Sequence, residues 1–143
     1  MSGVEEDSEA FPLGVQAGDP ASAGAVCWTK YTGAEDLRLQ VWGWDGASWT
    51  LSLEQSCSIE EGGYVQSLVE GLLEDTFFCF VFFDSEGAYS AVGRFRTPPE
   101  SGLPVVVFGG ISCTSQRYQP FPALSHGAKE VVDFVFLCGD QVY

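Results

Sequence analysis

Short apolar or alternating runs fill the first hundred residues of the chain, and clusters of Gly, Asp, Ser and Pro separate them. This pattern is typical of β-strands joined by tight turns, because no helical period interrupts it. It predicts strands at Leu13–Ala17, Ala25–Tyr31, Leu37–Trp44, Trp49–Leu53, Tyr64–Val69, Thr76–Phe83 and Ala88–Arg96. About seven short strands in this length indicate an antiparallel β-sandwich.

The pattern changes after the stretch from Thr97 to Pro104, which contains three prolines and a glycine. Such a composition is typical of a linker or a stiff turn. Beyond it, Val105–Phe108 and Val131–Leu137 are continuous apolar runs, as in strands buried on both faces. Between them, Phe121–Glu130 is predicted as a short helix. Strand, loop, helix and strand make a βαβ unit, which belongs to a layered α/β domain.

These signals divide the chain into four segments. We expect an acidic disordered tail at 1–10, a sandwich domain at 11–97, a linker at 98–104 and the truncated start of an α/β domain at 105–143. One helix cannot cover both faces of a two-stranded parallel unit. The last segment is therefore interpreted as the beginning of a domain whose remainder is absent.

The chain has 143 residues, 45% of them apolar, and a formal net charge of −14 from 20 acidic and 6 basic residues. The apolar content argues against intrinsic disorder despite the charge. The acidity argues against attraction to nucleic acid or to an anionic membrane surface, so no nucleic-acid-binding patch is expected. The apolar runs are far short of the roughly 20 residues that a membrane span needs. We interpret most of the carboxylates as a solvating surface.

The cysteines and the N-terminus indicate the compartment. The five cysteines are an odd number and none lies in a Cys-x-x-Cys pair, which argues against a disulfide framework or a structural zinc ribbon. The N-terminus is acidic where a secretory signal needs basic residues and then an apolar run. Together these features favour a reducing, cytoplasmic location.

Side-chain alternation along Thr76–Phe83 separates a core face from an outer face. The core face holds Phe78, Phe80 and Phe82, and the outer face holds Phe77, Cys79, Val81 and Phe83. If Trp28 is the core residue of its own strand, Cys27 also points outward. We therefore predict no disulfide between Cys27 and Cys79.

Several motifs carry a family resemblance. Phe11–Pro20 reads Phe-Pro-Leu-Gly-Val-Gln-Ala-Gly-Asp-Pro, and a Trp-Thr-Lys segment follows at Trp28–Lys30. Gly71–Phe80 and Gly93–Thr97 resemble a fibronectin-type strand and the usual exit from that domain. In this order the motifs resemble the alkaline phosphatase D-type phosphodiesterases, with Ala17, Cys27 and Lys30 replacing the usual serine, leucine and arginine. The resemblance runs from about Phe11 to Tyr143.

The resemblance implies a fold and a domain contact. The fold would be mostly β: a fibronectin III-like N-terminal sandwich followed by the incomplete start of an α/β metallophosphoesterase domain. The outer face with Phe77 and Phe83 needs cover, although scattered exposed aromatic residues are also normal. We favour packing of this face on the catalytic domain that follows.

Two motifs that follow apolar strands are the candidates for chemistry. They are Gly110-Ile111-Ser112-Cys113 and Gly139-Asp140-Gln141-Val142-Tyr143. In open α/β sheets, ligands bind beyond the carboxyl ends of the strands. If the two strands are parallel neighbours, Cys113 and Asp140 lie close together. A thiolate and a phenolate suit a trivalent metal such as iron, and a carboxylate can bridge two cations.

The same motifs resemble those of the metallophosphoesterase superfamily, whose alkaline phosphatase D-type members use Ser-Cys and Gly-Asp-x-x-Tyr. By this resemblance Cys113 and Tyr143 would bind iron, and Asp140 would bridge iron to calcium. The purple acid phosphatases also combine a fibronectin-like domain with Gly-Asp-x-x-Tyr, but their first ligand is aspartate. Cys113 therefore favours the first family.

Each of these residues also has a structural explanation. Cys113 alone fits a small buried side chain, Asp140 a turn residue after Gly139, and Tyr143 simply a last aromatic residue. Cys138 is assigned to packing and His126, the single histidine, to the surface. The Gly-Asn-His and Gly-His-x-His motifs of this class are absent, so the chain holds no complete catalytic set.

Three function classes follow. The first is a metal-dependent phosphoric ester hydrolase, either a phosphodiesterase or an alkaline phosphatase. This chain would be a fragment of it that is inactive alone. Binding of iron or calcium by the fragment itself is doubtful. The substrate of the full-length enzyme would be a phosphate ester. The second is a non-catalytic β-sandwich interaction module, supported by the missing ligands and the outward aromatics. Redox sensing by free thiols ranks last, because no cysteine has an obvious basic neighbour.

Overall fold

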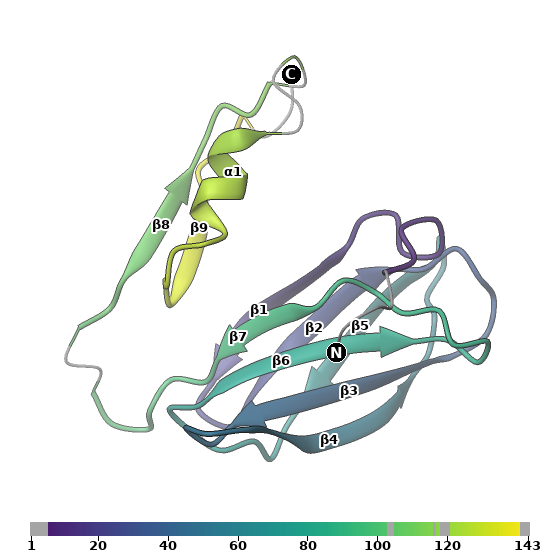
Figure 1. Ribbon diagram of the computed structural model, residues 1–143, viewed down its shortest axis with the longest axis horizontal. Coiled ribbons are helices and arrows are strands. Elements are labelled where there is room, and N and C mark those ends of the chain that lie inside the picture. The colour runs from purple at the N-terminus through teal and green to yellow at the C-terminus, as the bar shows by residue number, and fades with distance from the viewer. Residues whose placement is uncertain (1–5, 103–104, 116, 118–120, 141–143) are drawn as a thin grey trace. The chain divides into compact units, whose positions relative to one another are not determined.

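The computed structural model describes residues 6–102, 105–115, 117 and 121–140, and it divides the chain into two compact units, Met1–Ser101 and Gly102–Tyr143. The first unit is a β-sandwich of a three-stranded sheet, β1-β2-β5, and a four-stranded sheet, β4-β3-β6-β7 (Figure 1). Every strand pair in the two sheets is antiparallel. The strands are β1 (Val15–Ala21), β2 (Gly24–Lys30), β3 (Leu37–Trp44), β4 (Trp49–Cys57), β5 (Tyr64–Val69), β6 (Phe77–Phe83) and β7 (Gly93–Arg96).

This arrangement confirms the predicted mostly β fold with antiparallel sheets. Strands β3 and β5 have the predicted bounds, whereas β4 continues beyond Leu53 to Cys57. The last strand is shorter than predicted and begins at Gly93. Before it, the Asp84 carboxylate accepts hydrogen bonds from the backbone N–H groups of Glu86, Gly87 and Ala88, which closes a turn instead of extending a strand.

The core lies between the two sheets, and β6 supplies its largest side chains. Phe78, Phe80 and Phe82 are 0–2% exposed, as the alternation predicts. Phe95 of β7 stacks on Phe78, with ring centroids 5.2 Å apart. Val81 is also buried, although it lies on the outer side opposite Gln40.

The predicted direction of Cys27 is wrong. Cys27 is fully buried in the core cluster, whereas Trp28 is half-buried and packs against Tyr64 on the outer side of β2. Both alternating sets along β2 contain apolar residues, so alternation alone did not decide which set points inward. Cys27 and Cys79 are both free thiols. Cys27 points into the core of the sandwich from β2, whereas Cys79 lies on the outer face of β6.

The second unit contains β8 (Phe108–Ile111), α1 (Pro122–Gly127) and β9 (Phe134–Leu137). Strands β8 and β9 pair in parallel, as a βαβ unit requires. Helix α1 begins with Pro122, which is well suited to the first turn because its N–H would lack an intrahelical partner there. The four-segment division of the chain and its assignment to named domains stay predictions.

The apolar runs of the second unit are exposed, which agrees with the expectation that two strands and one helix cannot cover both faces of the pair. Val105 is 70% exposed, Phe108 62% and Phe136 52%. Two strands and a helix of six residues offer too little surface to cover both faces of the pair. Among the residues described here, no helix has the length and apolar character of a membrane span.

Candidate metal centre

The carboxyl ends of β8 and β9 bring the two predicted motifs together. In the parallel register Ile111 lies opposite Leu137, so Ser112-Cys113 and Cys138-Gly139-Asp140 leave the sheet at the same edge. Two backbone hydrogen bonds join the loops: Cys138 N–H donates to Ile111 O at 2.8 Å, and Thr114 N–H donates to Asp140 O at 2.9 Å.

The Cys113 thiol and the Asp140 carboxylate lie next to each other at this edge. Cys113 Sγ is 3.9 Å from Asp140 Oδ2, and both side chains are exposed to solvent. Metal–thiolate and metal–carboxylate bonds of about 2.3 and 2.1 Å allow the two donors to be up to about 4.4 Å apart on one cation. The pair therefore fits two ligands of a single metal ion without a change of the loop backbone.

Both residues have a left-handed backbone. Cys113 has φ of 58° and Asp140 has φ of 49°, a conformation that costs little for glycine but is unfavourable for a thiol-bearing residue. Asparagine and aspartate tolerate it better than most residues, so Cys113 is the more unusual of the two. Strain of this kind is concentrated at functional sites, which supports a role for Cys113 beyond chain reversal.

The remaining predicted site residues do not add a described ligand. Tyr143 lies outside the described residues. Within the described ranges, no three His, Cys, Asp or Glu side chains gather closely enough to hold a metal ion. Cys138, predicted to pack inside the strand, is instead exposed just after β9, because no further strand in the described part of the chain covers that side. His126 is exposed in the last turn of α1, as predicted.

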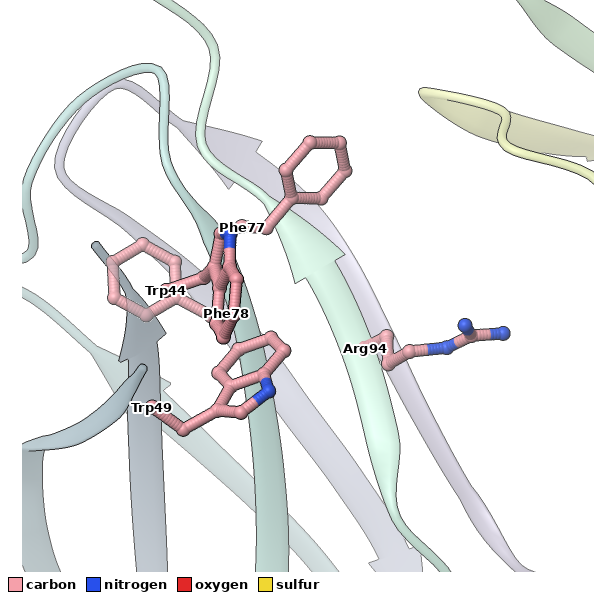
Figure 2. Close-up of a pocket in the computed structure, with 5 residues that line it drawn as sticks. All are labelled: Trp44, Trp49, Phe77, Phe78 and Arg94. Carbon is pink, nitrogen blue, oxygen red and sulfur yellow. The ribbon is translucent and has the colours of Figure 1, made fainter. Parts of the chain in front are cut away.

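An aromatic cleft on the sandwich is a feature that the sequence analysis missed. It has a volume of about 250 Å³ and is lined by Trp44, Trp49, Phe77, Phe78 and Arg94. Figure 2 shows Trp44 and Trp49 beside Phe78, while Arg94 extends away from these rings. The Trp44 and Trp49 ring centroids are 5.3 Å apart, across the last register pair of β3 and β4. Alternation along β3 indicates that Trp42 and Trp44 face outward, but it does not reveal that Trp49 of β4 lies beside Trp44.

Strand register places this cleft within a larger surface on the four-stranded sheet. We call the surface the aromatic–arginine face, and its members are Trp42, Trp44, Trp49, Leu51, Phe77, Cys79, Arg94 and Arg96. Arg96 lies over the Phe77 ring at 5.0 Å and pairs with Asp75. The face therefore combines exposed rings with two of the six basic residues of the chain.

Phe77 and Phe83, predicted to share one uncovered face, have different surroundings. Phe77 is 42% exposed within the aromatic–arginine face. Phe83 is half-buried, with Arg38 at 5.5 Å from its ring centroid and the tilted Tyr89 ring at 6.1 Å between centroids. The Phe83 end is thus largely covered by the sandwich itself, and the Phe77 end is the part still open to a partner.

Comparisons with known proteins agree with the sandwich. The chain is 28% identical to alkaline phosphatase D of Bacillus subtilis (strain 168) over 93% of its own length, and it spans about a quarter (25%) of the length of that curated relative. A solved structure of PhoD matches 99% of the chain and 30% of its own length, with 24% identity and a TM-score of 0.78, which supports the fold. The third fibronectin III domain of the human KIAA0343 protein matches 73% of the chain and 98% of that domain, with 19% identity and a TM-score of 0.48.

A family model describes most of the chain. The model of the PhoD-like phosphatase N-terminal domain matches residues 2–99, which include all seven strands of the sandwich. The chain therefore belongs to the family of the PhoD-like phosphatase N-terminal domain.

Proposed function

We propose that this chain is part of a metal-dependent phosphoric ester hydrolase of the alkaline phosphatase D type. It would supply the N-terminal sandwich and the first metal-ligand segment of a phosphodiesterase or phosphatase. The observation that carries the proposal is the pair of Cys113 Sγ and Asp140 Oδ2, which lie 3.9 Å apart beyond two parallel strands. The similarity to alkaline phosphatase D supports the reaction class and a phosphate ester as substrate.

The proposed ligands follow from the donor types. Cys113 and Tyr143 would hold iron, and Asp140 would be shared between iron and calcium, because a carboxylate suits both cations. A metal ion bound there supplies Lewis-acid stabilisation of the charge on the phosphoryl group. The chain itself holds the donors in place, because the Thr114 N–H to Asp140 O bond ties the two ligand loops together.

We further propose that the chain alone has no phosphatase turnover. The structure brings only two acidic or sulfur donors together in the region that it describes, so metal binding would be weak and the catalytic set incomplete. The test is an assay with a bis-aryl phosphate in the presence of iron and calcium, together with equilibrium dialysis of each metal. We expect no turnover above the buffer rate, and weak metal binding that Cys113→Ala and Asp140→Asn both remove.

Cys138→Ala is the matched control for this test, because it removes an exposed thiol that lies outside the proposed ligand set. It should leave metal binding unchanged. Metal-dependent turnover that disappears in Cys113→Ala would contradict the proposed inactivity. Equal metal binding by all four proteins would contradict the proposed site.

The second candidate function is an interaction module, and the aromatic–arginine face favours it. Trp44, Trp49 and Phe77 are 38–44% exposed within one surface, which is typical of a contact site. We propose that this face packs on the catalytic part of the longer protein, with Phe77 contributing more than the covered Phe83. In this form the two functions are compatible, because a docking module can belong to the enzyme.

The docking proposal is tested by adding the separately produced catalytic part of alkaline phosphatase D to this chain. We expect binding that Trp49→Ala weakens about ten-fold, as for a central aromatic contact. Trp28→Ala is the control, because Trp28 lies on the outer side of the other sheet. Equal affinities of both variants would show that the face is not the docking site.

A further inference from the structure

We propose that Ser112 is a positioning residue for the Cys113 ligand. Its hydroxyl would donate a hydrogen bond to the Cys113 sulfur when that sulfur is bound to metal, and would thereby set the strength of the metal–sulfur bond. The inference rests on the proposed metal site, and it adds a residue that is not itself a ligand.

The geometry of the sulfur carries the inference. Ser112 Oγ lies 3.3 Å from Cys113 Sγ, within the range of a hydrogen bond to sulfur. On its other side the same sulfur is 3.9 Å from Asp140 Oδ2. Cys113 Sγ is therefore placed between a hydroxyl group and a carboxylate.

The chemistry of the bound state decides which atom donates. In the free thiol either the hydroxyl or the thiol group can be the donor. A metal-bound cysteine is a thiolate and has no proton to give, so the Ser112 hydroxyl must donate. The ionised Asp140 carboxylate is an acceptor only, and it would bind the cation. Of these two side chains, Ser112 alone can stabilise the sulfur through a hydrogen bond.

Ser112 is also in a suitable place to hold its neighbour. It directly follows Ile111, the last residue of β8, whose carbonyl accepts the Cys138 N–H at 2.8 Å. The hydroxyl is thus carried by a paired strand end, and the left-handed turn begins only at Cys113. Groups fixed on regular elements orient ligands more accurately than groups on free loops.

Hydrogen bonds to a ligating sulfur have known effects. They orient the ligand, and they lower the electron density that the sulfur donates to the metal, which tunes the redox potential of the site. Loss of the hydrogen bond makes the sulfur a stronger donor, which changes the spectrum, whereas loss of the orientation lowers metal affinity, typically ten- to a hundred-fold for an outer partner. Removal of the Ser112 hydroxyl should therefore change both the affinity and the electronic spectrum of the bound metal.

The test titrates the full chain with cobalt(II) up to saturation. Cobalt–thiolate complexes have a sulfur-to-metal charge-transfer absorption, so the titration gives the affinity and its end point gives the spectrum. In Ser112→Ala we expect this absorption at longer wavelength and cobalt affinity at least ten-fold lower. Ser112→Thr keeps a hydroxyl and should restore both values. Ser125→Ala, an exposed serine of α1, should match the unchanged chain.

The possible results separate this inference from the metal site. If Ser112→Ala has the spectrum and affinity of the unchanged chain, the role of Ser112 is wrong and the Cys113 site stands. If the unchanged chain shows no charge-transfer absorption, or Cys113→Ala retains it, the Cys113 site is wrong and the role of Ser112 with it. Far-ultraviolet circular dichroism of each variant shows whether the sandwich is intact.

Discussion

At the scale of single residues, two cysteines show how surroundings determine what a thiol can do. Cys27 is fully buried, and desolvation together with the nearby Cys57 raises the pKa of its thiol to about 12. Cys113 is exposed beside a hydroxyl and a carboxylate. Cys27 therefore acts as a small apolar core residue, whereas Cys113 is free to react or to bind a cation.

The burial of Cys27 predicts a loss of stability at alkaline pH. Its thiol ionises near 9.0 in the unfolded chain but only near 12 in the folded protein, so its contribution is fully present below pH 9 and is lost as the pH rises toward 12. The free energy of unfolding should fall there by up to about 1.4 kcal/mol per pH unit for this group. Cys27→Ala should have a shallower slope in urea unfolding between pH 8.5 and 10.5. An identical slope would contradict the raised pKa.

Thiol counting gives a second prediction at this scale. In the native protein at pH 8 the exposed Cys113 and Cys138 should react quickly with Ellman's reagent, whereas Cys27 and Cys57 should not react until the chain unfolds. In the denatured, unreduced protein all five thiols should react, because all five cysteines are free in the structure. Cys113→Ala should lower the fast count by one. A denatured count of three would reveal a disulfide.

At the scale of elements, β6 and β7 fit closely against each other in the core. Gly93 lies opposite Phe80 in register, and a Cβ atom at Gly93 would come within 2.2 Å of the Phe80 ring. The fully buried ring therefore uses the space that the missing side chain leaves. This explains why β7 begins with glycine at that position.

This contact predicts a pair of coupled substitutions. Gly93→Ala should destabilise the protein by about 1–3 kcal/mol through overpacking. In the Phe80→Leu background the same change should cost less, because the smaller side chain leaves room. Gly18→Ala is the control, since a Cβ atom there meets nothing within 4 Å. Urea unfolding of the four core proteins measures the coupling, and additive effects would contradict the close contact.

The sequence predicts elements where one face is clearly apolar, and it fails where both are. On β6 the phenylalanines at alternate positions define the core face correctly, and the parallel pairing of two apolar runs correctly brings Cys113 near Asp140. On β2 both faces carry apolar residues, so Cys27 and Trp28 were assigned the wrong way round. The Trp44–Trp49 cleft was missed because it depends on pairing across a hairpin, which alternation within one strand does not reveal.

At the scale of the whole molecule, the two units differ in charge and in cover. Residues 102–143 contain two basic and three acidic residues, so residues 1–101 carry almost the entire net charge of −14. The sandwich also buries a continuous core, whereas most of the described apolar side chains in the two strands of the second unit are exposed. The first unit is therefore expected to be stable by itself, and the second to depend on further contacts.

Limited proteolysis tests this difference directly. A protease of broad specificity should first cut between Thr97 and Val107 and then digest β8, α1 and β9, because Val105 and Phe108 are 70% and 62% exposed and little packing opposes local opening. The fragment that remains should contain the seven strands of the sandwich. Its far-ultraviolet circular dichroism and melting temperature should match those of the sandwich transition in the full chain.

Phe80→Ala should make the sandwich itself sensitive to the protease, because loss of a buried phenylalanine costs about 3–5 kcal/mol, whereas Phe77→Ala, at an exposed position, should leave the sandwich protected. Equal protection on both sides of Pro98 and Pro99 would show that the second unit is fully packed, and would contradict the dependence proposed for it.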